Sequence, residues 1–317
     1  MRERFDVHAE ITKAIIAAIE NGPGDFQLPW HRPGVCLERP KNAVTGHRYS
    51  GVNILALWAS GMERGYESGL WASYRQWREL GGQVKKGEKG TVIVFCKELT
   101  VEVEDEMTGD ATPETRLFAR ASRVFNAAQV DGFELAAPEV KDPARVLAAA
   151  EAFVDATGVV IEHGGSSACY IPARDIIQMP PRERFTGTDT SSATESYYST
   201  VCHELTHWSG APHRLDRELS GRFGSKSYAM EELVAELGSA FLCADLAISP
   251  APRADHAAYL AGWLKVAKED PRALFTVASK ASQAASFLQG NGKVSCATSG
   301  ESNIRQDVRL RRLRHGT

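Results

Sequence analysis

The sequence has few cysteines, and none of its apolar segments is long. Six cysteines are scattered along the 317 residues with no C-x-x-C pair among them: Cys36, Cys96, Cys169, Cys202, Cys243 and Cys296. This spacing excludes a disulfide-stapled scaffold and a cysteine-ligated zinc site. No segment reaches the roughly 18 apolar residues of a membrane span, and the first residues lack the apolar stretch of a secretion signal. We therefore expect reduced thiols, a cytoplasmic location and no membrane partner.

The chain also lacks a strong net charge. Its 37 lysines and arginines nearly balance 40 aspartates and glutamates, for a formal net charge of −3. A nucleic-acid signal must therefore be local. With 43% hydrophobic and 24% charged residues, the composition is that of a globular protein, and the length suits about two domains. We expect one domain over residues 1–135, a second over 136–290, and a disordered basic tail over 291–317.

Hydrophobic periodicity and turn signals predict an α+β fold. In the N-terminal part we expect helices over 7–21, from 53 onward and over 71–80, and strands over 91–95, 99–106 and 117–125 around an acidic loop near 104–115. In the C-terminal part we expect helices over 143–157, 228–242, 254–268 and 271–288, and a small sheet of strands over 159–163, 168–172 and 175–180. An edge strand of such a sheet could pair with an extended peptide.

The segment 200–208 carries an H-E-x-x-H pattern. His203 and His207 are four residues apart, so on a helix they lie on one face and can bind one metal ion. Glu204 lies about 100° around the helix, where it can reach a water on the open side of the metal. Cys202 and Leu205 are expected to face the interior. A helix that carries two histidines by chance is the weaker reading, because a second acidic helix follows.

That second helix begins about 20 residues after His207. Glu232 and Glu236 share one of its faces, and Glu231 is about 100° away from them and is expected to be solvated. A purely structural helix would point both carboxylates into water. A zinc helix would point one at the metal and use the other to orient a histidine ligand, which is the reading we favour.

Basic and aromatic residues alternate in the N-terminal part. Between Pro29 and Lys97 there are eleven lysines and arginines against five acidic residues, interleaved with tryptophans and tyrosines. Cations that track phosphates and aromatic faces that stack on bases are the requirements of single-stranded nucleic-acid binding. Composition alone leaves open that the aromatics are core residues and the charges a solvated face.

Several motifs resemble the ArdC-type antirestriction proteins of conjugative plasmids and the related TraC-like primase-associated proteins. The resemblance rests on Pro29-Trp30, the segment 40–53, Trp71-x-x-Tyr74-x-Gln76, the turn 84–90, and the C-terminal segments 197–215 and 228–236. It implies an N-terminal domain that binds single-stranded DNA and a C-terminal zinc-metallopeptidase fold. It further implies protection of incoming plasmid DNA from restriction in the bacterial cytoplasm, with a host restriction enzyme or another protein as a possible partner.

The resemblance also implies roles for single residues. Candidates for binding single-stranded DNA are Trp30, Asn42, Arg48, Tyr49, Asn53, Trp71, Tyr74, Gln76, Lys85, Lys86 and Lys89. The spacing of the acidic helix is similar to that of gluzincin peptidases, which implies Glu232 as the third ligand of Zn²⁺ or another divalent metal and Glu236 behind it, with the reverse as the alternative. Glu204 is then the general base, and Tyr228 could assist on the oxyanion side. The other reading is a non-catalytic, metal-stabilised scaffold that acts only by binding DNA or a restriction enzyme.

Overall fold

The computed structural model describes residues 6–20, 38–104, 111–135, 142–187, 191–219, 225–248 and 268–290. Four segments with sequence-based expectations lie wholly or largely outside these residues: Trp30, the proposed linker from 136, the helix expected over 254–268 and the tail from 291. No described helix is both long enough and apolar enough to span a membrane.

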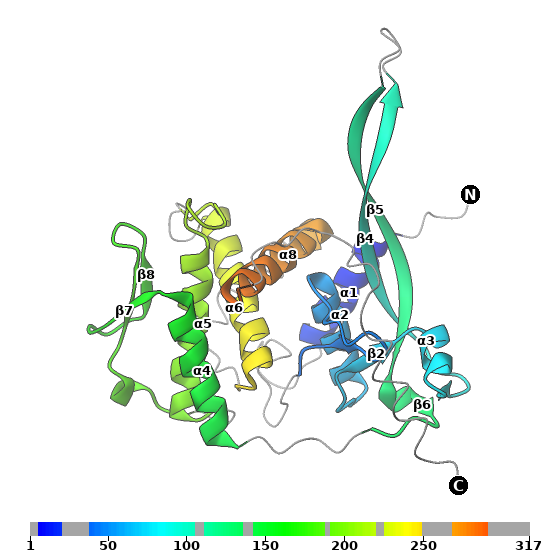
Figure 1. Cartoon of the computed structure of the whole chain (residues 1–317), viewed down its shortest axis with the longest axis horizontal. Helices are drawn as coiled ribbons and strands as arrows, with labels where there is room; N and C mark the ends of the chain where they lie inside the picture. The colour runs from blue at the N-terminus through cyan, green and yellow to red at the C-terminus, as the bar shows by residue number, and fades with distance from the viewer. Residues whose placement is uncertain are drawn as a thin grey trace.

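The described residues of the N-terminal part form helices and small sheets (Figure 1). Its elements are α1 (Val7–Glu20), β1 (Lys41–Asn42), α2 (Val52–Glu63), β2 (Leu70–Ala72), α3 (Tyr74–Glu79), β3 (Gln83–Val84), β4 (Thr91–Glu104), β5 (Ala111–Asn126) and β6 (Val130–Asp131). The larger sheet has the order β1-β2-β5-β4, with β1 parallel to β2, and β3 pairs with β6. Strands β4 and β5 pair from Thr91↔Val124 to Glu104↔Ala111 and form the arm that projects from the body in Figure 1.

Two expectations for this part were wrong in detail. The segment 71–80 is not one helix: Trp71 and Ala72 pair with β5, and Ser73 then caps α3 through a capping box with Gln76. The pairing joins residues more than 50 positions apart, so no local pattern reports it. The strands expected over 91–95 and 99–106 are one strand, and its partner starts at Ala111 rather than 117, because residues 111–115, which were expected to be a loop, pair with β4.

The C-terminal part packs helices beside a three-stranded sheet. Its elements are α4 (Pro143–Thr157), β7 (Val160–His163), β8 (Cys169–Ile171), β9 (Ile176–Met179), α5 (Ala193–Ser209), α6 (Lys226–Leu246) and α8 (Pro271–Leu288). The sheet order is β7-β9-β8, with β7 parallel and β8 antiparallel to β9. The expected helices at 143–157, 228–242 and 271–288 and the three short strands are confirmed, as is the α+β class.

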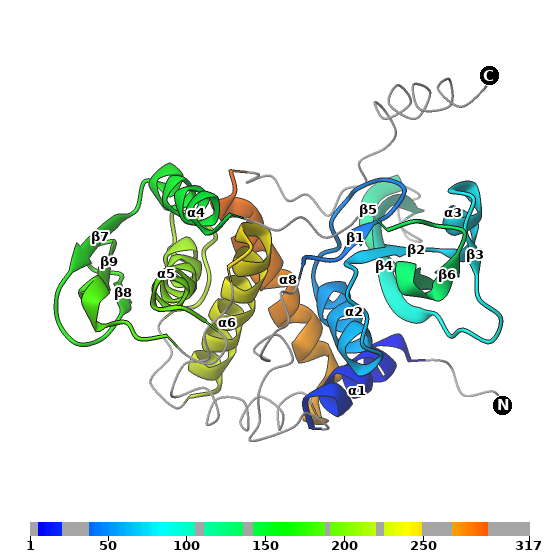
Figure 2. The same cartoon turned by 90° about the horizontal axis from the view of Figure 1, so that it is seen from below.

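One hydrophobic core runs through both parts. It joins α1 and α2 to α5, α6 and α8, and Figure 2 shows α8 lying between α6 and the α1–α2 pair. The rings of Trp58 on α2 and Phe241 on α6 have their centroids 5.7 Å apart. The amide of Gly51, just before α2, donates to Oγ of Ser282 on α8 at 2.7 Å. The metal-site helices are therefore braced directly by the N-terminal helices.

Candidate metal centre

Helix α5 presents its two histidines from a well-defined start. Ser192 caps the helix by accepting from the amide of Glu195, and the amide of Ser192 donates in return to the carboxylate of Glu195. His203 and His207 then lie one turn apart on the face toward α6, and their Nε2 atoms are 3.2 Å from each other. His203 is buried and His207 half-buried, so the pair is largely shielded from solvent. Cys202 and Leu205 are buried as expected.

Small residues let α6 approach α5 closely. A Cβ placed on Gly238 would lie 2.6 Å from Cγ2 of Thr206, so glycine is required there. Its neighbour Ser239 donates to the carbonyl of Ser199 at 2.9 Å. This contact between the helices brings the acidic face of α6 within reach of the histidines.

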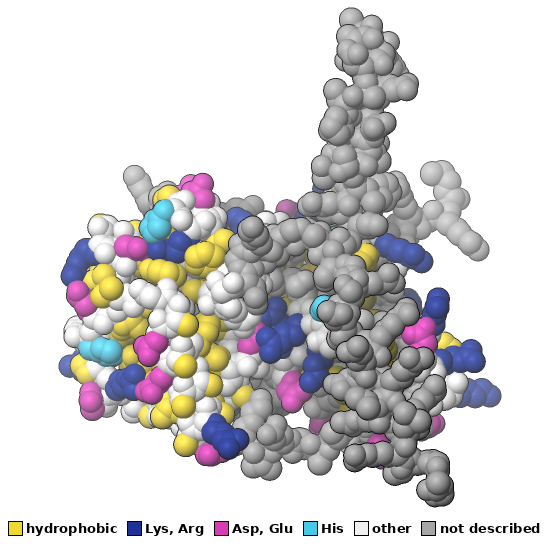
Figure 3. Space-filling model, in the orientation of Figure 1, with side chains coloured by type: hydrophobic (Ala, Val, Ile, Leu, Met, Phe, Trp, Pro, Cys, Tyr) yellow, Lys and Arg dark blue, Asp and Glu magenta, His cyan; other side chains and the backbone are white. Residues whose placement is uncertain are grey.

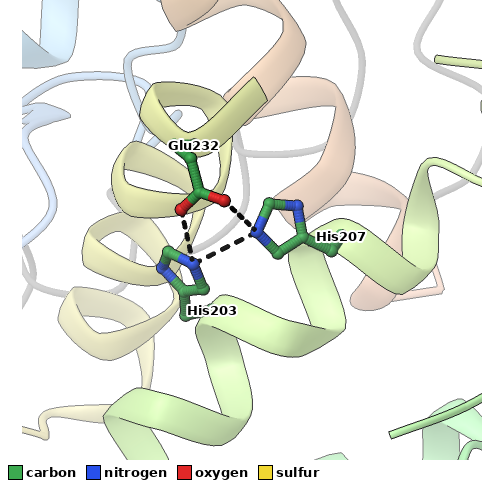
Figure 4. A group of neighbouring side chains, drawn as sticks. All are labelled: His203, His207 and Glu232. Carbon is green, nitrogen blue, oxygen red and sulfur yellow. Dashed lines mark hydrogen bonds and ion pairs between the residues drawn. The ribbon is translucent and has the colours of Figure 1, made fainter. Parts of the chain in front are cut away.

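Glu232 completes a group of three ligand atoms (Figure 4). Its Oε2 is 3.5 Å from Nε2 of His203, and its Oε1 is 3.7 Å from Nε2 of His207. Metal–nitrogen bonds of about 2.0–2.1 Å at a tetrahedral ion separate two ligand atoms by about 3.4 Å. The group, whose ligand atoms all lie within 4.8 Å of one another, therefore fits a zinc-sized divalent cation with little movement.

Two further carboxylates lie behind the histidines. Oε2 of Glu236 is 3.4 Å from Nδ1 of His203, and Oε1 of Glu231 is 3.2 Å from Nδ1 of His207. The expectation that Glu231 is solvated was wrong. Its carboxylate is also held by the buried Arg217, at 2.8 Å and 3.1 Å. Each histidine thus has a carboxylate at the nitrogen that faces away from the group of three, an arrangement that fixes ring orientation at metal sites.

These contacts shift the pKa values of Glu232 and Glu231. Burial raises the pKa of Glu232, but the hydrogen bond with His203 and the charges of both histidines outweigh it and bring the pKa down to about 2. Tyr228, one turn earlier on α6, adds a hydrogen bond to the same carboxylate. For Glu231, burial again raises the pKa, and the contacts with His207 and Arg217 lower it below its usual value.

Glu204 lies between α5 and the edge strand β8. It is buried, and its Oε2 accepts a hydrogen bond from the amide of Tyr170 at 2.9 Å. The Tyr170 hydroxyl donates to Asp175, which is also paired with Arg214. The guanidinium of Arg214 in turn lies 3.7 Å from the ring centroid of Trp208, near the end of α5. This cluster clamps β8 against the helix that carries Glu204.

The sequence-based search missed Tyr170, Asp175 and Arg217. Their contacts with Glu204, Arg214 and Glu231, respectively, join residues 14 to 39 positions apart, so periodicity does not connect them. The sequence offered one signal for Glu231. Glu231 and Glu232 are adjacent and precede an apolar stripe, and only one of two adjacent helical residues can face the metal.

Some of the candidates for DNA binding are buried or hydrogen-bonded within the protein, and others are exposed. Trp71 is only 2% exposed and packs in the core, so the expectation that it stacks on a base was wrong. Asn53 bonds both the amide and the carbonyl of Val94, which fastens α2 to β4. The remaining polar candidates of the sheet edge hydrogen-bond to one another: Asn42, Tyr49 and Gln76.

The other candidates lie on the surface of the N-terminal part. Tyr74 is 45% exposed, and Lys85, Lys86 and Lys89 are exposed in and before the turn that leads into β4. Arg48 is also exposed and lies against the C-terminal part.

Comparisons with known proteins match the N-terminal and the C-terminal part to separate families. A family model for the N-terminal domain of the anti-restriction factor ArdC matches residues 5–125, and one for a zincin-like metallopeptidase matches residues 148–280. The uncharacterized protein y4eC of Sinorhizobium fredii is 46% identical over 286 residues, which cover 89% of this chain and 91% of y4eC. Part of the DNA primase TraC of Escherichia coli is 36% identical; the match covers 89% of this chain but only 27% of TraC.

Two solved structures of the antirestriction protein ArdC from plasmid R388 share the whole architecture. The metal-free structure has a TM-score of 0.71 at 39% identity and covers 91% of this chain and 98% of that protein. The Mn(II)-bound structure has a TM-score of 0.69 at 36% identity, with 92% and 99% covered. The chain therefore belongs to the family of ArdC-type antirestriction proteins, with an ArdC N-terminal domain followed by a zincin-like metallopeptidase domain.

Proposed function

We propose that this protein binds single-stranded DNA through its N-terminal part and protects incoming plasmid DNA from host restriction in the bacterial cytoplasm. We further propose that its C-terminal part is a zinc-dependent hydrolase of peptide bonds. The observation that carries the proposal is the convergence of His203, His207 and Glu232 beside Glu204. Family membership supports the antirestriction role.

The donor set suits a divalent metal. Two imidazole nitrogens and one carboxylate are the ligands of catalytic zinc sites that leave a position open for water. The Mn(II)-bound relative supports a divalent ion at this fold. Zinc is our preferred ion because of the nitrogen ligands, and manganese is the alternative that metal analysis of the purified protein would identify.

The chain's own residues have separate roles in this proposal. A metal bound here would supply a Lewis acid and lower the pKa of a bound water. Glu204, which follows His203 on α5, is the proposed general base for a water at the site, and its carboxylate accepts a hydrogen bond from the amide of Tyr170. Glu231 and Glu236 orient the two histidines. Tyr228, already hydrogen-bonded to Glu232, is the candidate donor to a developing oxyanion.

Substitution of Glu204 separates this proposal from a non-catalytic scaffold. Glu204→Gln keeps the shape of the side chain and leaves all three candidate metal ligands in place. If hydrolysis is the mechanism, the variant binds metal normally and loses antirestriction in a plasmid-transfer assay. Full protection by the variant would instead favour action by binding to DNA or to a restriction enzyme.

DNA binding is tested directly with the whole chain. We expect single-stranded oligonucleotides to bind more tightly than duplexes of the same length, with an affinity that falls as salt rises. Exposed Tyr74 and the lysines of the turn supply stacking and phosphate contacts. Equal affinity for both forms, or none for either, would remove this half of the proposal.

A further inference from the structure

The boundary between the two parts holds an unbalanced group of charges. The seam cluster consists of Arg39, Arg48 and Asp245, the last of these near the end of α6. Nη1 of Arg39 is 2.8 Å from Oδ2 of Asp245, and Nη1 of Arg48 is 3.0 Å from Oδ1. Two guanidinium groups thus share one carboxylate, which leaves a net charge of about +1.

The two arginines differ in exposure. The side chains of Arg39 and Asp245 are only 7% and 3% exposed, whereas that of Arg48 is 54% exposed. Gln289 donates to Oδ2 of Asp245 at 2.8 Å, so the buried pair is well supported. Arg48 is at ion-pair distance from Oδ1, yet that oxygen has no aligned hydrogen bond in the described part of the chain. Arg48 is therefore the loosely held member of the cluster.

Further positive charge near the cluster is not matched by acceptors among the described residues. Nε of Arg39 is buried and has no hydrogen-bond partner among the described residues. Lys41 on β1 is exposed and forms an antiparallel bridge with Arg48, which places the two side chains on the same face of the strand pair. In Figure 3 basic side chains gather near the middle of the face shown, with acidic ones beside them.

We propose that the seam cluster is an anion site where a phosphate of a nucleic-acid strand binds Arg48 and displaces it from Asp245. Lys41 adds a second outward charge, and buried Arg39 supplies a fixed positive field that keeps Asp245 paired when Arg48 leaves. Arginine suits this role because its planar group can pair with phosphate through two donors. The inference rests on the proposed DNA binding and names a contact on the N-terminal part, at its boundary with the C-terminal part, where a strand would bind.

The first test is Arg48→Ala in the full chain, titrated with an oligothymidine at several salt concentrations. We expect the affinity to fall by about fivefold or more, and the slope of log K against log salt to decrease in magnitude by about 0.7, since one phosphate contact with a single strand is lost. The matched control is Arg174→Ala, which removes an arginine of similar exposure, 57%, from a surface pair with Glu162 on the C-terminal part. An unchanged affinity and slope for Arg48→Ala would overturn the proposal.

The second test is Asp245→Asn, for which the expected change has the opposite sign. Without the competing carboxylate, Arg48 is free for phosphate, and the affinity should rise by a few-fold. A purely structural role of the cluster would lower the affinity or leave it unchanged, and either result overturns the displacement. Because Asp245 is buried, circular dichroism must first show that the variant is folded. If it is not, Arg48→Ala decides alone, since it leaves the pair of Arg39 and Asp245 intact.

A binding titration with inorganic tripolyphosphate shows whether the seam site and the proposed DNA binding stand or fail separately. If the wild-type chain binds no oligonucleotide but binds tripolyphosphate in a manner that Arg48→Ala weakens, the anion site is real and the proposed DNA binding fails. If oligonucleotides bind and Arg48→Ala has no effect, the DNA binding stands and the seam site is overturned. If neither ligand binds, both are overturned.

Discussion

The amide of Tyr170 donates a hydrogen bond to Oε2 of Glu204 across the space between an edge strand and a helix. The orientation of Glu204 therefore depends on the position of β8 as well as on α5. β8 is held in turn by the pairing of Asp175 with Arg214. An extended peptide that pairs with β8 would meet the candidate general base at the same strand edge.

Glu231→Gln should weaken metal binding and also lower stability, because it leaves the buried Arg217 without its paired charge. The carboxylate orients His207, and the loss of such a contact commonly lowers metal affinity about 10- to 100-fold. Calorimetric titration of the apo protein with Zn²⁺ and Mn²⁺ measures the change. Glu162→Gln, in an exposed pair with Arg174, serves as the control. Equal affinities for wild type and Glu231→Gln would show that the contact is dispensable.

Gly238→Ala should destabilise the fold, against the usual trend for a helix. In an open helix position the change from glycine to alanine stabilises by about 1 kcal/mol. Here the new Cβ would meet Thr206 at 2.6 Å and push α6 away from α5. The control is Gly61→Ala on α2, where the nearest atom, on Trp71, would be 3.9 Å away and stabilisation is expected. Urea midpoints of the two variants that shift in the same direction would contradict this explanation.

The pair of Asp175 and Arg214 should make a pH-dependent contribution to stability. The hydrogen bond from Arg214 is the largest cause that lowers the pKa of Asp175 from 3.8 to about 2. A lowered carboxyl pKa stabilises the fold above the unfolded value, and the contribution is lost as pH falls from about 4 to about 2. Its size is modest because the Asp175 side chain is 41% exposed.

Asp175→Asn isolates this charge. Asp175 has a φ of 53°, and asparagine tolerates that left-handed conformation. We expect the urea midpoints of wild type and variant to differ most near about pH 6 and to converge only as the pH approaches about 2. A difference that stays constant over this range would assign the effect to packing rather than to charge.

Asn53→Ala should reduce stability and leave DNA affinity unchanged. The side chain satisfies both the amide and the carbonyl of Val94, and loss of both bonds costs about 1–3 kcal/mol. Urea denaturation and oligonucleotide titration of the same variant test both statements. A variant of normal stability that binds DNA poorly would indicate that Asn53 contacts DNA.

The sequence was most informative where function depends on short spacing. The four-residue intervals of two helices predict that His203 and His207 share a face and that a glutamate of the later helix joins them. The choice of Glu232 over Glu236 came from the resemblance to gluzincin peptidases. The polar network behind them was not predictable, because Arg217 reaches Glu231 through a contact that helical periodicity does not encode. Composition misled most at Trp71, since the same aromatic ring can stack on a base or fill a core, and only the pairing of β2 with β5 decides.

The continuous core limits which recombination events between homologous genes would give a folded protein. Trp58 and Phe241 come from the N-terminal and C-terminal parts, yet they pack in one core. A recombination event that exchanged only one half with a distant relative would leave mismatched packing and a bare apolar face. The relatives compared above each match about nine-tenths of this chain, across both halves. The two halves are expected to change together, with substitutions at α2 compensated on α6 and α8.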